Sequence, residues 1–381
     1  MTAFSSFFQA GFECATHTNI HKKRLDIVAA TSHDIFVRQD YARLKELGIH
    51  TVREGARWHV IETSPGVYDF SSLALLYDAA QELDIEIVLD LMHFGWPDHV
   101  DIFGPEFVSS FERFAAATAR FLDGRGLAKA FVLPVNEISY LSWAGGDQAA
   151  INPHARGRGG ALKKQLVEAT IRASRVLRRE LPSVCIASAE PVIHIVGRES
   201  IPGDCFAAEK HRLAMFEAWD MLTGKSHPEL GGRPDYLDVV GVNFYDRNQW
   251  VNHGETLAPE DARYRPFHQI LIEVWKRYGC PMFVSETGTE DDARPSWLAY
   301  VGAEVRKALE RGVPIHGICL YPILNHPGWD DDRHCCNGLY DYADENGNRE
   351  MFLPLAEAIE HQQALHRAFV ASEDPDVALI A

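Results

Sequence analysis

The chain has 381 residues, of which 46% are apolar and 24% charged, so it can bury the core of a sizeable globular protein. Its formal net charge of −17 would repel a nucleic-acid backbone or an anionic membrane surface. No apolar run approaches the roughly 20 residues of a membrane span, and the stretch from Met1 to Gly11 lacks the basic region of a secretory signal. We therefore expect a cytoplasmic protein whose partner is a neutral small molecule, neither nucleic acid nor membrane.

The seven cysteines are odd in number and scattered, without the spacing of a zinc site or of a disulfide framework. Reduced thiols in a cytoplasm fit this pattern best. The adjacent pair Cys335 and Cys336 is interpreted as packed or solvated thiols, with redox activity as the alternative. We predict neither a metal ion nor another cofactor.

Short β-rich apolar runs alternate with amphipathic helical stretches about every 40 to 50 residues, as stacked βα units require. Eight such runs predict a (β/α)8 barrel, an α/β fold that forms a single domain over residues 1–371. The predicted strands span 8–14, 50–54, 85–92, 130–136, 184–190, 238–244, 281–286 and 315–321. The predicted helices span 34–47, 71–83, 105–122, 161–180, 262–279 and 295–311.

One connection is longer than the others. Residues 197–236 are rich in glycine and proline, which predicts a long βα loop that contains a helix near 206–222 and shapes the mouth of the barrel. Residues 372–381 are predicted to be a loose tail.

In such barrels the functional residues gather where strands meet the loops that follow them. Glu137 and Glu286 each end a buried apolar run, where a carboxylate is costly to desolvate unless it is paired or used. If these runs are strands four and seven, the two groups face each other across the barrel mouth. Further polar residues at predicted strand ends are His17, Arg53, Arg57, His93, Asn136, Glu190, Asn243 and Tyr245, followed by 325–329.

Two facing carboxylates suit glycoside hydrolysis with retention, which uses one protonated carboxyl as an acid and one ionised carboxylate as a nucleophile. Arg53 would hold Glu286 ionised, whereas Glu137 would stay protonated until the charge on Glu286 disappears into a glycosyl ester. Tyr245 would donate a hydrogen bond to the nucleophile. Glu190 is interpreted as a structural partner of a neighbouring arginine.

The motifs around these residues resemble those of the glycoside hydrolases of family one, the β-glucosidase group, and the likeness runs nearly end to end. The similar segments are Val52-Arg-Glu-Gly-Ala-Arg-Trp58, His93-Phe-Gly-Trp-Pro97, Asn136-Glu137-Ile138, Gly241-Val-Asn-Phe-Tyr245, Ser285-Glu-Thr-Gly288 and Tyr321-Pro-Ile-Leu-Asn-His-Pro-Gly-Trp329.

The resemblance implies a retaining, exo-acting β-glycosidase with Glu137 as the acid/base and Glu286 as the nucleophile. It also implies that Asn136 binds the sugar 2-hydroxyl and that His93 binds the 3-hydroxyl. The other substrate-binding or supporting residues that it implies are His17, Arg53, Asn243, Tyr245, Tyr321 and Trp329.

The far side of the sugar site departs from the family. Gly328 stands where the family has a glutamate that grips the 4- and 6-hydroxyls, His17 aligns with its sugar-binding glutamine, and Tyr321 replaces a tryptophan. The glycone is therefore open. One residue of 330–334 is a candidate replacement for the lost glutamate, although acidic loops are usually solvated. At least two of the tryptophans near strand ends are expected to line the cleft: Trp58, Trp96, Trp143, Trp250 and Trp329.

Three other functions remain open. A transglycosidase would keep the glycosyl-enzyme ester but pass the sugar to an acceptor other than water. A metal-dependent barrel hydrolase is suggested by the 18 histidines, but Asn19 breaks a His-x-His pair after His17 and no helix carries a His-Glu-x-x-His pattern. The third alternative is a catalytically silent sugar-binding barrel.

Overall fold

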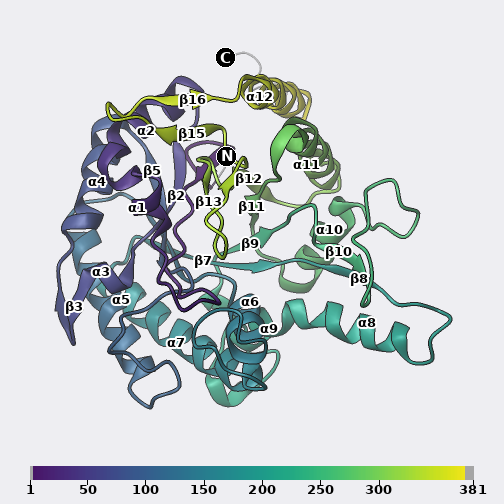
Figure 1. Cartoon of the computed structure of the whole chain (residues 1–381), viewed down its shortest axis with the longest axis horizontal. Coiled ribbons are helices and arrows are strands. Elements are labelled where there is room, and N and C mark those ends of the chain that lie inside the picture. Colours follow the sequence, from purple (N-terminus) through teal and green to yellow (C-terminus); the bar gives the residue numbers. More distant parts are fainter. Residues whose placement is uncertain (1–2, 374–381) are drawn as a thin grey trace.

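The computed structural model describes residues 3–373, and its centre is a closed barrel of eight parallel strands (Figure 1). The strands follow one another around the barrel in chain order, each paired with the next, and the last pairs with the first. This confirms the predicted (β/α)8 barrel. The barrel strands are β1 Phe8–Gly11, β2 Thr51–Gly55, β5 Glu86–Met92, β6 Ala130–Val135, β7 Val184–Pro191, β9 Val239–Asn243, β11 Met282–Thr287 and β12 Ile315–Leu320.

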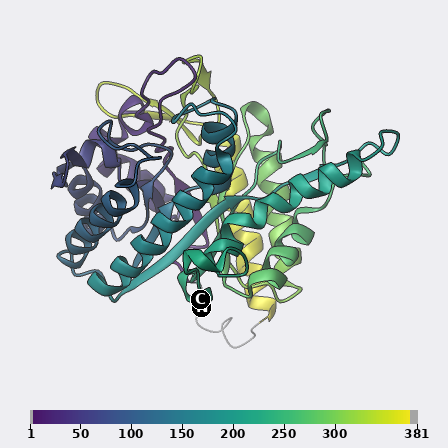
Figure 2. The same ribbon diagram turned by 90° about the horizontal axis from the view of Figure 1, so that it is seen from below.

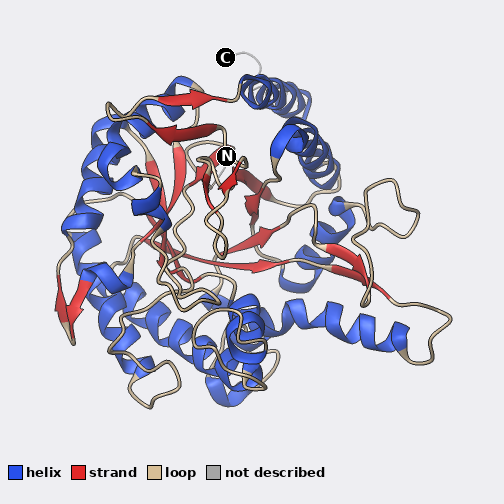
Figure 3. Cartoon of the chain, in the orientation of Figure 1, coloured by secondary structure: helices blue, strands red, loops and turns tan. Residues whose placement is uncertain are grey.

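Helices cover the outside of the barrel (Figure 3). Those that follow barrel strands bury one apolar face against the sheet, as amphipathic helices do. Helix α10 begins at Phe267, later than the predicted 262, because Pro266 immediately precedes it. The helices are α1 Ile27–Ala30, α2 His33–Glu46, α3 Trp58–Ile61, α4 Ser71–Leu83, α5 Phe107–Asp123, α6 Ile138–Leu141, α7 Gly159–Glu180, α8 Asp204–Leu213, α9 Glu217–Leu222, α10 Phe267–Tyr278, α11 Arg294–Leu309 and α12 Leu353–Glu373.

The two ends of the barrel differ in chemistry. At the N-terminal ends of the strands, Phe4 is buried with its ring 4.5 Å from that of Phe131 and 5.0 Å from that of Phe283, and these rings close the barrel with an apolar plug. Polar side chains occupy the opposite end. Strand β1 ends at Gly11 instead of the predicted residue 14, so the residues that follow it lie in the loop at this polar mouth.

The long loop at 197–236 departs from the barrel. It contains α8 and α9 where one helix was predicted, and a 3-10 turn at Ala214–Phe216 separates them. Figure 2 shows α8 and the loop before it projecting away from the barrel. Strand β8 His194–Val196, just before this loop, pairs in parallel with β10 Gln249–Val251. The short outer strands are β3 Glu62–Ser64, β4 Val67–Tyr68, β13 His326–Pro327, β14 His334–Cys335, β15 Tyr340–Ala343 and β16 Arg349–Met351.

The described part of the chain ends in a helix that the sequence analysis did not anticipate. Helix α12 packs against α11 on the outside of the barrel and continues to residue 373, so its last two residues take up the start of the predicted tail at 372–381. The remainder of that tail, 374–381, lies outside the described residues. Between residues 3 and 373, no helix has the length and apolar character needed to cross a bilayer.

Candidate active site

Glu137 and Glu286 line the same cavity at the polar mouth of the barrel. Glu137 follows the end of β6 and Glu286 lies near the end of β11, the fourth and seventh strands of the barrel in chain order. The cavity has a volume of about 650 Å³ and is open to solvent at one side. Both carboxyl groups are nevertheless 9% exposed or less. Two nearly buried carboxyl groups in one cavity need different partners if both are to be tolerated.

Glu137 has surroundings that favour its neutral form. Burial, together with the negative charge of Glu286, raises the pKa of Glu137 to about 8. A side-chain hydrogen bond from Asn243 opposes this rise in pKa. Asn243 Nδ2 donates to Glu137 Oε1 at 2.8 Å, which favours the ionised form of Glu137. Its backbone is left-handed, with φ of 45° and ψ of 60°, a conformation that costs a non-glycine residue free energy and is often found at functional sites.

Glu286 accepts a hydrogen bond on each of its two carboxylate oxygens. Arg53 Nη1 donates to Glu286 Oε1 at 2.7 Å, and the Tyr245 hydroxyl donates to Glu286 Oε2 at 2.7 Å. Burial and the charge of Glu286 raise the pKa of Tyr245, so this hydroxyl keeps its proton. The two glutamates thus occupy opposite electrostatic environments in one cavity.

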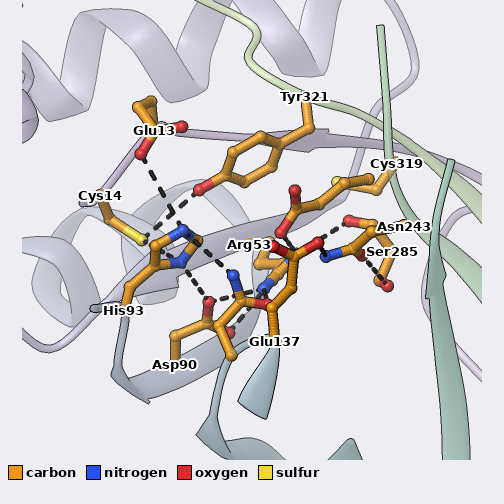
Figure 4. A network of polar contacts seen from close by, with 12 residues as sticks. Glu13, Cys14, Arg53, Asp90, His93, Glu137, Asn243, Ser285, Cys319 and Tyr321 are labelled. Carbon is orange, nitrogen blue, oxygen red and sulfur yellow. Dashed lines mark hydrogen bonds and ion pairs between the residues drawn. The ribbon is translucent and has the colours of Figure 1, made fainter. Parts of the chain in front are cut away.

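Arg53 is fully buried in the middle of β2 and organises the floor of the cavity (Figure 4). Its guanidinium donates to Glu286, to the Ser285 carbonyl, to Asn136 Oδ1 and to both oxygens of Asp90. A group with five N–H donors in a rigid plane is suited to such a set of acceptors.

His93, Asn136 and Tyr321 lie beside this arginine. Asn136 is fully buried and its Nδ2 lies 3.2 Å from His93 Nε2. His93 lines the cavity, with Nδ1 2.9 Å from Asp90 Oδ2. Tyr321 also lines it, with its ring parallel to that of His93 at 6.0 Å and 5.3 Å from the Arg53 guanidinium carbon. Predicted residues that lie on or just after six of the barrel strands, β2, β5, β6, β9, β11 and β12, are therefore gathered around one cavity.

Glu13 is a cavity residue that the sequence analysis missed. It lies in the loop after β1, lines the cavity, and has Oε1 4.0 Å from His93 Nε2. His17, predicted at this position, is fully buried, does not line the cavity and packs edge-on against Trp329 at 4.6 Å. Both of its ring nitrogens lack a hydrogen-bond partner, and burial lowers the pKa of His17 to about 3. The available signal for Glu13 was a charged residue inside the otherwise apolar end of the predicted strand 8–14, between Phe12 and Cys14.

Cys14, Asp90 and His93 are the one group of buried metal-ligand types found in the described chain. Cys14 Sγ lies 3.3 Å from His93 Nδ1, and burial raises the pKa of this thiol. Both Arg53 Nη2, at 2.7 Å, and His93 Nδ1 approach the same oxygen of Asp90. The guanidinium therefore already supplies the positive charge that this carboxylate needs, and it would repel a metal ion at the same oxygen.

The acidic segment after Trp329 does not reach the cavity. Asp331 contacts Arg333, Asp332 pairs with Lys23, and Arg333 pairs with Glu290. None of residues 330–334 lines the cavity. The polar side chains on this side are instead His326 and Asn337, which contact each other at 2.9 Å, together with Glu290 on the rim.

Glu190 was predicted to pair with a neighbouring arginine, and this prediction is wrong. No arginine pairs with Glu190 in the described chain; its Oε2 accepts a hydrogen bond from the Ser139 backbone N–H at 2.9 Å, and its Oε1 is buried without a partner. Burial raises the pKa of Glu190 to about 7 despite this hydrogen bond. It therefore supports the start of α6, directly after Glu137.

A second cavity of about 560 Å³ opens beside the first and shares four lining residues with it: Tyr140, Pro191, Arg247 and Asn248. It lies between the segment after Glu137 and the long loop, and its apolar lining includes Trp143, Ile193, Met215 and Trp250. Of the five tryptophans considered, Trp329 lines the first cavity, Trp143 and Trp250 line the second, and Trp58 and Trp96 are buried elsewhere.

Comparison with known proteins places this barrel among glycosidase structures. The family 1 β-glucosidase from Thermotoga maritima superposes with a TM-score of 0.78 at 16% identity, covering 95% of this chain and 97% of that one. Its complex with glucoimidazole gives a TM-score of 0.77 at 16% identity over 95% and 97% of the chains. The AHE enzyme from Alicyclobacillus herbarius gives 0.78 at 17% identity over 96% and 99%. The Thermotoga structures are thus those of a family 1 β-glucosidase, the family that the motif resemblance implied.

Sequence likeness is more limited. A β-galactosidase from Sulfolobus acidocaldarius is 34% identical over 121 residues, a match that covers 24% of this chain and 24% of that enzyme. The match thus spans about a quarter of the length of that curated relative. No model of a protein family matches the chain.

Proposed function

We propose that this protein is a retaining, exo-acting β-glycosidase that cleaves by double displacement, with Glu137 as the acid/base and Glu286 as the nucleophile. The observation that carries the proposal is the division of charge in one cavity. Burial and its neighbour raise the pKa of Glu137 to about 8, while Arg53 and Tyr245 bind the two oxygens of Glu286. The neutral form of Glu137 is thus favoured, while a cation and a hydroxyl donate to Glu286, which is the division of roles that the reaction requires.

In the first step, Glu286 attacks the anomeric carbon as the bond to the leaving oxygen breaks, and Glu137 gives its proton to that oxygen. The product is a glycosyl ester of Glu286. Because the ester is neutral, the charge that raised the pKa of Glu137 is gone. Glu137, now ionised, then accepts a proton from water while the water oxygen attacks the anomeric carbon, and the ester bond breaks to restore the Glu286 carboxylate.

The bound sugar would lie over the floor made by Arg53, Asn136 and His93. Asn136 and His93 are the candidates for the 2- and 3-hydroxyls, and Trp329 and Tyr321 are candidate walls for the sugar ring. Glu13 joins this set in place of His17, because its carboxylate lines the cavity near His93 Nε2. The names of the relatives, β-glucosidase and β-galactosidase, support a hexoside as substrate.

The second cavity would receive the leaving group. It adjoins the segment that follows the proposed acid, and its surface is largely apolar, with Trp143 and Trp250 among its lining residues. Large apolar leaving groups would therefore bind better than small polar ones.

A panel of nitrophenyl β-glycosides varied at C2, C4 and C6, with α-anomers as controls, tests this function. We expect turnover of at least one β-glycoside with retained configuration at the anomeric carbon, followed by NMR. Inverted product would contradict double displacement. Transfer of the sugar to added acceptor sugars in preference to water would favour the transglycosidase. Binding of glycosides without any turnover would favour the catalytically silent sugar-binding barrel.

A further inference from the structure

Asp90 is a fully buried carboxylate inside the barrel that the proposed mechanism does not use. It lies within β5, two residues before the end of the strand. Arg53 Nε donates to Asp90 Oδ1 at 3.0 Å and Arg53 Nη2 donates to Asp90 Oδ2 at 2.7 Å. Burial opposes ionisation, but Arg53 and His93 outweigh it and hold the pKa of Asp90 below its usual value. Asp90 is therefore a second anion on the arginine that holds Glu286.

The hydrogen bonds of Arg53 account for all five of its N–H groups. Nε and one Nη2 hydrogen go to Asp90, the other Nη2 hydrogen goes to Asn136 Oδ1 at 2.7 Å, and Nη1 donates to Glu286 Oε1 at 2.7 Å and to the Ser285 carbonyl at 3.1 Å. The guanidinium cannot turn toward Glu286 without losing a bond to Asp90. Asp90 thereby limits Glu286 to one of the five donors.

Asp90 also contacts His93, a side chain that lines the cavity. Its Oδ2 lies 2.9 Å from His93 Nδ1, so this nitrogen carries a proton that it donates to the carboxylate. Asn136 then links His93 Nε2, at 3.2 Å, back to Arg53. Arg53, Asp90, His93 and Asn136 form a closed ring of polar contacts, in which a shift of any one member displaces the others.

We propose that Asp90 is a positioning residue that divides Arg53 between itself and Glu286 and, through the same carboxylate, fixes the ring of His93 in the cavity. The proposal rests on the function proposed above. In this role, a single buried residue aligns both the proposed nucleophile, Glu286, and a proposed sugar-binding side chain, His93.

Asp90→Asn tests the proposal with little change in shape. Asparagine offers one acceptor oxygen in place of two and points an N–H at a donor, so Arg53 moves toward Glu286 and His93 is released. We expect kcat/KM to fall roughly 100-fold, as for a small misplacement of reacting groups. The basic limb of the kcat/KM profile, set by Glu137, should move to higher pH, because Asp90 helps to raise the pKa of His93 against its burial, and the positive charge of His93 lowers the pKa of Glu137.

Glu54→Gln is the matched control. Glu54 is also a fully buried carboxylate on a barrel strand and contacts a histidine, with Oε1 2.8 Å from His33 Nε2 and accepting from the Tyr41 hydroxyl at 2.8 Å. It does not line the cavity. This variant should lower Tm without moving either limb. If Asp90→Asn behaves like Glu54→Gln, with a lower Tm and an unchanged pH profile, Asp90 is merely structural and the proposal is wrong.

A measurement on the wild-type protein needs no turnover. In protein labelled with ¹⁵N-histidine, His93 Nδ1 should carry a proton that is far downfield and protected from exchange, because it is bonded to a buried carboxylate; the spectrum of His93→Gln assigns the signal. An unprotonated Nδ1 overturns the proposal. A protonated Nδ1 in a protein that cleaves no glycoside would support the role of Asp90 in the ring and contradict only the proposed function.

Discussion

The side-chain amide of Asn243 donates a hydrogen bond to Glu137 across 2.8 Å, and this contact works against the protonation state that an acid catalyst needs. Asn243 ends β9, two residues before Tyr245, which donates to Glu286. A single strand end therefore contacts both proposed catalytic groups. The amide keeps Glu137 oriented while burial and Glu286 keep it neutral.

This relationship predicts the direction of a pH shift. Because Glu137 acts while protonated, kcat/KM should fall as pH rises through about 8. Asn243→Ala removes a bond that favours the charged form, so the basic limb should move to higher pH. Asn252→Ala, which removes another buried amide that donates to a carboxylate, Asp204 Oδ1 at 2.9 Å, is the control and should leave the limb in place. A shift to lower pH in Asn243→Ala would contradict the assignment.

The role of Glu137 as the acid predicts a dependence on the leaving group. Glu137→Gln cannot supply a proton, so kcat/KM should fall by at least about 100-fold for alkyl glycosides and far less for dinitrophenyl glycosides, whose oxygen leaves unassisted. Glu190→Gln removes the next buried carboxyl group along the barrel and should affect both substrates alike. Equal losses on both substrates in Glu137→Gln would remove Glu137 from the role of acid.

The same substitution should stabilise the fold. The pKa of Glu137 is about 8 in the folded chain against an ordinary value of 4.5, so the folded state binds more protons between these values and loses stability as pH rises through them. Glutamine carries no charge and escapes this loss. Tm of Glu137→Gln should therefore exceed that of the wild type at pH 9 and approach it at pH 4, as measured by calorimetry. A constant difference at both values would show that charge is not the cause.

The second cavity predicts a selective effect on the leaving group. Trp143 is 50% exposed and lines this cavity but not the first. Trp143→Ala should raise KM several-fold for glycosides with large aromatic leaving groups and leave methyl glycosides nearly unchanged. Ile35→Ala, which removes another exposed apolar side chain on the distant helix α2, serves as the control. An equal rise in KM for both substrates would place the leaving group elsewhere.

Much of the fold could be predicted from the sequence because a parallel barrel buries both faces of its strands. Each strand then appears as a continuous apolar run, and all eight runs were found. Helix α12 was missed because its exposed residues, among them Leu353, Leu365 and Val370, blur its amphipathic pattern. The long loop was found from its glycines and prolines, but the turn that splits its helix carries neither residue.

The site was predicted best where functional residues lie at strand ends. Glu137 and Glu286 lie at the ends of buried runs, so their convergence followed from the fold, and Arg53 was found although it lies within β2. Asp90 lies within a strand, and its signal was a charged residue in an otherwise apolar run from Ile87 to Met92. Glu13 was missed because strand β1 ends earlier than its apolar pattern suggests, which shifts the residue that faces the cavity.

Trapping of the covalent intermediate tests the central claim most directly. A 2-fluoro glycoside with a good leaving group, chosen from the β-glycosides that the protein cleaves, should inactivate it with a stoichiometry of about one label per chain. Peptide mass spectrometry should then find the sugar on Glu286. Attachment to Glu137, Glu13 or Asp90 instead, or turnover of the same sugar with no covalent adduct, would contradict the assignment of Glu286 as the nucleophile.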